Sequence, residues 1–352
     1  MNIYVLNGLN GIVNLIDTFE SVIWNVQFYD VNDFELTVPG TPKNIQTLVE
    51  GALLVRDFDV SEDEYHNVMK IQNREITFDI EKGWIMTVTG GGLKTILKQR
   101  IVWAQTNLTG SVESGIRSVI TDNIISPSDT DRTIDDFILE EAQGFTDTFD
   151  IQLLGETIAD WLVELCPVYG FGWDVYIKEG KYVFTLKKGI DRTYDQNVVT
   201  PVVFSPEYDN LYTARYIYEK ADYKNAALVG GEGEGTAKRT ATIGTATGLD
   251  RYETYIDGSG VSSNGEIITV ETYMAMLQDF GIQQLSGTMF TESFEGAINT
   301  EGIYKINEDY FLGDIIQIDN GLIAATSRII ETIYCEDTNG NSLTCTFSNW
   351  GE

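Results

Sequence analysis

Short runs of apolar and aromatic residues, separated by glycine, proline, asparagine and aspartate, dominate residues 1–106. Several such runs at short spacing are typical of antiparallel strands in a sandwich or barrel. They comprise IYVL, IVNLI, VIWNVQFY, FELTVP, ALLVRDF, VMKIQNREITFDI and WIMTVT. A short helix is predicted next, because Leu93, Ile96 and Leu97 share one helical face. We therefore predict a first β-barrel domain whose end is plugged by this helix.

The pattern changes between residues 107 and 200, where apolar positions recur at helical spacing. One helix is predicted over residues 111–124, and a second over residues 156–167, where a proline ends it. A hairpin of two alternating strands is predicted over residues 172–189. This mixture predicts an α+β domain, distinct from the region before it.

Residues 201–235 combine a strand, a turn, a second strand and a glycine-rich exit in one short run. The apolar residues 202–204 and the alternating residues 212–218 predict the two strands. Proline, aspartate and asparagine lie between them, and these residues favour turns. We expect this stretch to begin a second barrel, which the chain leaves at the glycines.

A weak internal similarity sets residues 51–57 beside residues 313–319. Each segment precedes a long apolar hairpin, which contains Arg74 in the first case and Arg328 in the second. Short strand patterns also match by chance, so both a true repeat and a coincidence stay open. A true repeat predicts that the chain carries two similar barrels.

The predicted fold is mainly β with α+β parts. It has two antiparallel β-barrel domains, an α+β domain between them, and an insertion that splits the second barrel. The predicted boundaries are 1–106 for the first barrel, 107–200 for the α+β domain, 201–235 with 302–352 for the second barrel, and 236–301 for the inserted domain.

The charge balance limits the partners of the chain. Its 352 residues include 54 acidic and 23 basic side chains, for a formal net charge of -31. This charge repels phosphate backbones and anionic headgroups, so it argues against gripping nucleic acid but allows DNA to slide past. No segment approaches the roughly 20 apolar residues of a membrane helix, and the N-terminus lacks a secretion signal. We expect a soluble protein, made in a cytoplasm, with no membrane insertion of its own.

No residue pattern predicts a catalytic, cofactor-binding or metal-binding site, and we expect no cofactor. His66 is the single histidine, so zinc ligation and a catalytic triad each lack partners. A phosphate loop needs a glycine directly before its lysine, but here Leu93 lies between the glycines at 90–92 and the lysine. This departure favours a tight strand-to-helix turn. The glutamates among the glycines at 231–235 would repel a pyrophosphate.

Acidic residues offer several apparent pairs, but neighbours in a strand point to opposite faces and so make poor glycosidase pairs. The pairs are Asp57 with Asp59, Asp135 with Asp136, and Glu140 with Glu141. The segment 337–341 resembles part of a calcium loop but has Ser348 at the twelfth position instead of glutamate. A plain hairpin turn is the better interpretation.

The three cysteines make a poor disulfide framework. Cys335 and Cys345 flank the turn signal Asn339–Gly340, which leaves a cross-strand bridge open. A tight turn at that signal would instead set Cys335 opposite Thr344.

Short motifs along nearly the whole chain resemble the hub proteins of long-tailed bacteriophages, the tail-associated (Tal-like) baseplate hub family. In chain order they are Ser21 and Trp24 with Phe34–Pro39, Gly90 with Leu93, Leu97 and Arg100, Gly189–Arg192, Val203–Ser205 with Tyr208–Leu211, Tyr223–Asn225, Gly230 with Glu232, Asp250–Glu253, and Leu312–Asp314. The resemblance implies two barrels per chain and a homotrimer around the tail axis, so that six similar barrels match a six-fold partner.

This resemblance predicts a structural, non-enzymatic hub at the virion tail tip, assembled in the host cytoplasm. Its trimeric ring would join the tail tube or distal tail proteins to tail tip or fibre proteins, and DNA would pass through the channel without specific binding. Many members continue into receptor-binding or wall-degrading modules, and we expect those activities on other proteins. The alternatives are an acidic β-rich glycoside hydrolase or a glycan-binding module that acts on the bacterial cell wall.

Overall fold

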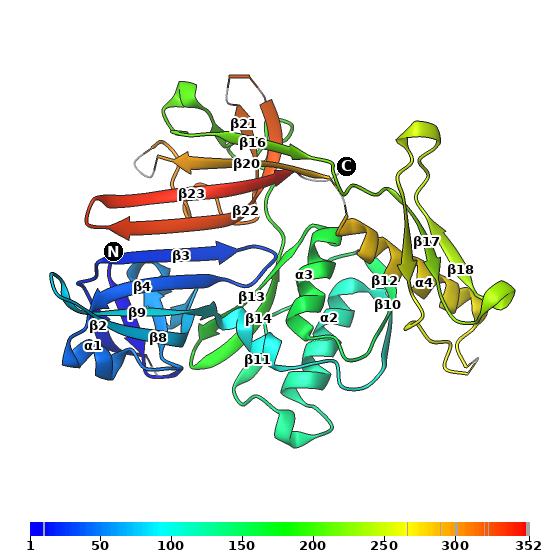
Figure 1. Ribbon diagram of the computed structural model, residues 1–352, viewed down its shortest axis with the longest axis horizontal. Coiled ribbons are helices and arrows are strands. Elements are labelled where there is room, and N and C mark those ends of the chain that lie inside the picture. The colour runs from blue at the N-terminus through cyan, green and yellow to red at the C-terminus, as the bar shows by residue number, and fades with distance from the viewer. Residues whose placement is uncertain are drawn as a thin grey trace.

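The computed structural model of the protein describes residues 1–9, 11–265, 267–288, 290–299, 302–319, 321–322 and 324–349. Strands dominate, and the N-terminal and C-terminal strands lie side by side, with β3 next to β22 (Figure 1). Helices α2 and α3 lie in the middle part of the chain beside this sheet (Figure 1). A mainly β protein with α+β parts, as predicted, is thereby confirmed.

The largest sheet of the described residues has 13 strands. Its order is β16 (Arg215–Glu219), β20 (Thr291–Ile298), β23 (Gly340–Asn349), β22 (Ala324–Asp337), β3 (Ser21–Gln27), β4 (Asp33–Pro39), β9 (Gly83–Gly92), β8 (Met69–Asp79), β5 (Leu53–Arg56), β1 (Ile3–Leu6) and β2 (Ile12–Ile16), while β21 (Ile315–Asp319) pairs with β22 and carries β15 (Val203–Phe204) on its other side.

The described residues also form three smaller sheets and four α-helices, besides short 3-10 and π-helical segments. The sheets are β11 (Phe137–Leu139), β14 (Lys181–Lys187), β13 (Gly172–Lys178), β7 (Glu64–Tyr65) and β6 (Val60–Ser61); β10 (Thr106–Ser111) with β12 (Thr148–Leu153); and β18 (Thr240–Ile243), β17 (Ala226–Gly230) and β19 (Glu253–Asp257). The helices are α1 (Pro42–Thr47), α2 (Val112–Ile120), α3 (Ile158–Tyr169) and α4 (Val270–Ser286). Of these helices, none is long and apolar enough to cross a lipid bilayer.

Helix boundaries follow local sequence signals, with one correction. The Ser111 hydroxyl accepts a hydrogen bond from the Ser114 amide at 3.3 Å and caps α2. Pro167 was predicted to end the helix before it, yet α3 continues to Tyr169 and ends at Gly170, whose φ of 66° is left-handed. Buried Leu165 and Cys166 hold this last turn against the core, so packing outweighs the one hydrogen bond that the proline removes.

The strands form two units of equal connectivity. In the first unit the antiparallel pairs are β3 with β4, β4 with β9, β9 with β8, and β8 with β5. In the second they are β16 with β20, β20 with β23, β23 with β22, and β22 with β21. The chain visits the five strands in the same order each time, so of the two interpretations that the sequence left open, strand pairing supports the true repeat.

Details of the hairpins agree with this equivalence. The register of β8 shifts at Gln72 and that of β22 at Ile330, each seven positions before the aspartate that ends the strand. Asp79 and Asp337 both accept hydrogen bonds from amides of the following turn. On this alignment Arg74 corresponds to Thr332 and not, as the sequence comparison suggested, to Arg328.

The two units join directly, because β22 of the second pairs with β3 of the first over seven residues. The predicted pair of closed barrels is therefore not found: among the described strands no barrel closes, and the paired strands run as one open sheet from β16 to β2. Sequence patterns locate strands but carry no signal for a contact about 300 residues apart.

An insertion lies in the second unit between β16 and β20, where the first unit has only residues 28–32 between β3 and β4. It contains β17 to β19 and α4, whose buried core includes Val229, Tyr273 and Leu277. The pairing differs from the predicted boundaries at both ends, since β17 belongs to the inserted sheet and β20 to the large sheet. The small hairpin β6–β7 also leaves the N-terminal region and pairs with β13.

The turn between β22 and β23 is shifted by one residue from the predicted one. Asp337 pairs with Gly340, so Thr338 and Asn339 form the turn, and Cys335 lies opposite Ser342 instead of Thr344. All three cysteines are free.

Candidate functional site

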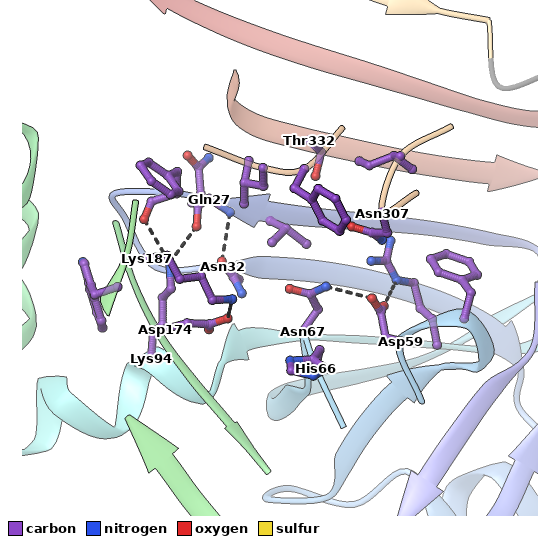
Figure 2. A pocket seen from close by; sticks show the side chains of 18 of the residues that line it. Gln27, Asn32, Asp59, His66, Asn67, Lys94, Asp174, Lys187, Asn307 and Thr332 are labelled. Atoms are coloured by element: carbon purple, nitrogen blue, oxygen red, sulfur yellow. Dashed lines mark hydrogen bonds and ion pairs between the residues drawn. The ribbon is translucent and has the colours of Figure 1, made fainter. Parts of the chain in front are cut away.

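A cavity of about 390 Å³ lies where the large sheet, the 3-10 helix Leu93–Gln99, the strands β13 and β14 and residues 306–312 meet. Figure 2 shows its polar side chains in two groups, one around Lys94 and Asp174 and the other around Asp59. The cavity is a candidate binding or active site, because several charged side chains line it inside the molecule.

Lys94 is almost completely buried beneath this cavity. Its Nζ atom donates hydrogen bonds to the backbone oxygens of Gln27 at 2.6 Å and Asp30 at 2.9 Å, and it lies 4.9 Å from the ring centre of Trp173. Burial lowers the pKa of Lys94 to about 8, although Asp174 opposes the shift. The lysine therefore fastens the β3–β4 loop. The glycines at 90–92 do not form the predicted turn, because they are the last residues of strand β9 and pair with β4 and β8, and the 3-10 helix follows directly at Leu93.

Asp174 and Lys187 form an ion pair at 2.6 Å on the hairpin β13–β14. Burial raises the pKa of Asp174, but Lys187 and Lys94 outweigh burial and hold this pKa below its usual value. The carboxylate is thus a stable anion shared by two cations, and not a proton-transfer group near neutral pH.

The second group contains Arg56, Asp59 and Asn67. The Nε atom of Arg56 meets Asp59 Oδ2 at 2.5 Å, and Asn67 Nδ2 donates to Asp59 Oδ1 at 2.8 Å. Asp59 and Asp57 do not act as a carboxylate pair, because Asp57 accepts hydrogen bonds from Asn2 instead. Both oxygens of Asp59 are occupied by structural partners.

The remaining candidates from the sequence are also dispersed. His66 stacks on Tyr176 with ring centres 4.7 Å apart, and its Nε2 atom lies 3.3 Å from Glu64. Glu140 accepts a hydrogen bond from the Tyr176 hydroxyl, while Asp135, Asp136 and Glu141 are exposed. In the described part of the chain, no three histidine, cysteine or carboxylate side chains gather as metal ligands. The cavity is best explained as a satisfied polar junction between strands, loop and hairpin.

Substitution of Asn67 tests the second group. Asn67 has a φ of 49° in the left-handed region, where asparagine and glycine are favoured. We expect Asn67→Gly to lower the free energy of unfolding by about 1 kcal/mol through the lost hydrogen bond. Asn67→Ala should cost about 1–2 kcal/mol more, because alanine adds backbone strain. Urea unfolding of both variants measures this, and equal values for the two would contradict it.

Two short motifs that are far apart in the sequence, Gly189–Arg192 and Leu312–Asp314, are in contact in the structure. Asp314 Oδ1 accepts from the Ile190 amide at 2.8 Å, and Asp314 Oδ2 meets Arg192 Nε at 2.5 Å. Gly189 packs so closely that an added Cβ would lie 1.7 Å from the Gly313 oxygen. These contacts anchor the end of the α+β region to the second strand unit, and the sequence offered no signal for this long-range contact.

The outward face of the large sheet is the second candidate site. Side chains alternate between faces in a strand, and most of the apolar ones of β3, β4, β22 and β23 point to the core, whereas Ile23 is exposed on the other face. The other face carries many carboxylates, including Asp33, Glu35, Glu75, Glu295 and Glu331. Burial raises the pKa of Asp33, and the Glu331 carboxylate adds to this rise. Negative charge is therefore concentrated on one broad polar surface.

Solved structures with similar folds include a tail protein and two prophage tail proteins. A tail protein from Neisseria meningitidis MC58 is 12% identical, with a TM-score of 0.60 over 99% of this chain and 96% of that chain. The 43 kDa tail protein of prophage MuSo2 from Shewanella oneidensis is 11% identical, with a TM-score of 0.62 over 99% and 98%. Prophage tail protein gp18 from Listeria monocytogenes EGD-e is 10% identical, with a TM-score of 0.53 over 99% and 94%. The chain has a phage tail-protein fold.

A family model described as "Siphovirus ReqiPepy6 Gp37-like protein" matches residues 2–347. The chain therefore belongs to this family, and the predicted relationship to proteins of long-tailed phage tails is confirmed. No curated protein matches the sequence. Nothing in these similarities favours the alternative of a glycoside hydrolase.

Proposed function

We propose that this chain is a structural, non-enzymatic hub of the phage tail, and that three copies form a ring around the DNA passage. The observation that carries the proposal is the pair of equivalent five-strand units in one chain. A closed ring must present matching surfaces to its partner, and three chains with two such units each offer six equivalent surfaces. The ring would thus join a six-fold tail tube or distal tail protein to tail tip or fibre proteins.

In the proposed hub, the chain has four parts. Two strand units provide the ring, the α+β region over residues 107–200 braces them, and the insertion around α4 extends the second unit. The anchoring of Asp314 to Arg192 supports a rigid connection between the α+β region and the second unit. Such rigidity suits a protein that transmits load between tail and tip.

The acidic face of the large sheet supports the proposed DNA passage. Phosphate contacts dominate DNA binding, so a wall of carboxylates keeps DNA from adhering as it moves. The one cation that we place on this face of the strands β16 and β20, Arg215, is paired with Glu295 at 3.1 Å. DNA would be guided by exclusion and not held.

The oligomeric state tests the proposed hub. Light scattering on the purified full chain should give three times the mass of one chain, and negative-stain images should show a three-fold ring with six inner lobes. A monomer at every concentration, or a ring of other symmetry, would overturn the proposal.

Reversal of charge tests the passage separately. The double variant Glu35→Lys with Glu295→Lys should still form rings but should retain short duplex DNA at low salt, because it places lysines on the proposed lumen. The matched control Glu81→Lys with Glu308→Lys changes the net charge equally at exposed positions elsewhere. Equal DNA retention by both variants would contradict a lumen on this face.

A further inference from the structure

The junction between the two strand units inside one chain has a defined register. Strand β22 pairs antiparallel with β3 from Glu331 opposite Gln27 to Asp337 opposite Ser21. Tyr334 lies opposite Trp24, and Cys335 lies opposite Ile23. This junction uses the far half of β22, because the near half pairs with β21.

Strand β8 is the equivalent of β22, and strand β16 is the equivalent of β3. Both β8 and β16 have a free edge. In the first unit, β8 pairs with β5 only at Met69 and Lys70, and residues 73–79 pair with β9 alone among the described strands. In the second unit, the only described strand that pairs with β16 is β20. All residues of β8 from Asn73 to Asp79 are exposed, whereas most of the corresponding residues of β22 are covered by β3. Exposed strand edges are ready to pair with another chain.

The residues that pair with β3 and with β16 show which residue of β16 is equivalent to each residue of β3. Trp24 lies opposite Phe34 in the first unit, and Tyr216 lies opposite Phe294 in the second. Both aromatic pairs are in contact, with ring centres 5.5 Å and 5.0 Å apart. If β16 pairs with β8 as β3 pairs with β22, these equivalent positions fix the register completely. Tyr216 then lies opposite Ile76, as Trp24 lies opposite Tyr334.

The side chains on the free edges of β8 and β16 resemble those that meet at the β22–β3 junction. On the face that points to the core at the internal junction, β3 carries buried Val22, Trp24 and Val26. The equivalent positions on β16 and β8 include the apolar side chains of Tyr218, Ile76 and Phe78, which are 54%, 37% and 62% exposed in the single chain. Aromatic and β-branched pairs across strands are the ones that stabilise sheets.

We propose that β8 of one chain pairs antiparallel with β16 of a second copy, in the register that sets Ile76 opposite Tyr216 and Thr77 opposite Arg215. This inference rests on the proposed ring and names the contact that closes it. The chain's own β22–β3 junction is the template, so the six unit-to-unit contacts of the ring would be of one kind, three within chains and three between them.

Engineered disulfides test the register. Thr77→Cys with Arg215→Cys, in a Cys335→Ser background, should form disulfides between chains, with a covalent trimer as the largest product on non-reducing gels. The matched control is Ile23→Cys alone, because native Cys335 lies opposite residue 23 at the equivalent place and should form a bridge within the chain. A second control, Thr77→Cys with Glu219→Cys, moves one thiol four residues along β16, beyond the reach of a disulfide.

The outcomes separate the inference from the proposed function. A bridge in Ile23→Cys with no bridge between chains, in a protein that light scattering shows to be trimeric, overturns the β8–β16 pairing but leaves the ring standing. A monomeric protein without cross-links overturns both. Cross-linked ladders that continue beyond the trimer support the strand pairing and overturn the three-chain closure.

A charge on the apolar face gives an independent test. Ile76→Asp should shift the trimer to monomers, because it places a carboxylate between Tyr216 and its neighbours. The control Ile12→Asp changes an isoleucine of similar exposure, 44% against 37%, on β2, outside the proposed contact. Equal dissociation of both variants, or of neither, would overturn the proposed contact.

Discussion

Asp314→Ala lowers the free energy of unfolding by about 3–5 kcal/mol, the usual cost of removing one partner of a buried ion pair. The carboxylate is buried and accepts from the amides of Ile190 and Phe311 as well as from Arg192. Its loss leaves the mostly buried Arg192 guanidinium and two amides without this acceptor. Urea or thermal unfolding of the full chain measures the change.

The conservative variant Asp314→Asn separates charge from shape. It keeps one oxygen acceptor but loses the ion pair, so we expect a smaller loss, about half that of alanine. Asp319→Ala, at the exposed end of the strand β21 that follows Asp314, should change the free energy of unfolding by less than about 1 kcal/mol. A loss for Asp314→Ala no larger than that of Asp319→Ala would show that this junction does not stabilise the fold.

Lys94→Met changes the pH dependence of stability. Burial lowers the pKa of Lys94 from 10.5 in the unfolded chain to about 8 in the folded one. Between these values the unfolded chain binds more protons, so this lysine makes the wild-type protein more stable as the pH rises. The free energy of unfolding of the wild type, relative to the variant, should rise by about 3 kcal/mol from below pH 8 to above pH 10.

The subtraction of the variant is the control, because titrations common to both proteins cancel. Several tyrosines, such as Tyr310 and Tyr334, have raised pKa values, and they oppose the lysine effect above pH 10 in both proteins. Chemical unfolding at pH 7.5, 8.5 and 9.5 measures the difference. A difference that stays constant over this range contradicts a lowered pKa for Lys94.

Local patterns predicted most strands and helices because they depend on neighbours in the sequence. The hairpin of β13 and β14, with its turn at Glu179–Gly180, follows from alternation and a glycine in the left-handed region. The buried face of the 3-10 helix was also predicted, since Leu93, Ile96 and Leu97 are all buried. Boundaries failed where packing outweighed a local signal, as at Pro167.

Contacts between distant residues could not be predicted in this way. Nothing in the pattern of β3 indicates that its partner is β22, and this pairing is what replaces two separate barrels by one open sheet. The repeat leaves a weak trace in the sequence, but the alignment of Arg74 with Arg328 is wrong, because the bulges that set the register have no sequence signal. The meeting of Gly189 with Gly313 was hidden for the same reason.

The β22–β3 junction also determines how the speed of assembly depends on protein concentration. Both strands belong to one chain, so their pairing is a first-order step that dilution does not slow. The pairing of β8 with β16 of another chain is second-order, and its rate falls as the protein is diluted. Three chains therefore form a ring of six units through two encounters, where six separate units would need five, and half of the joints are made before any two chains meet.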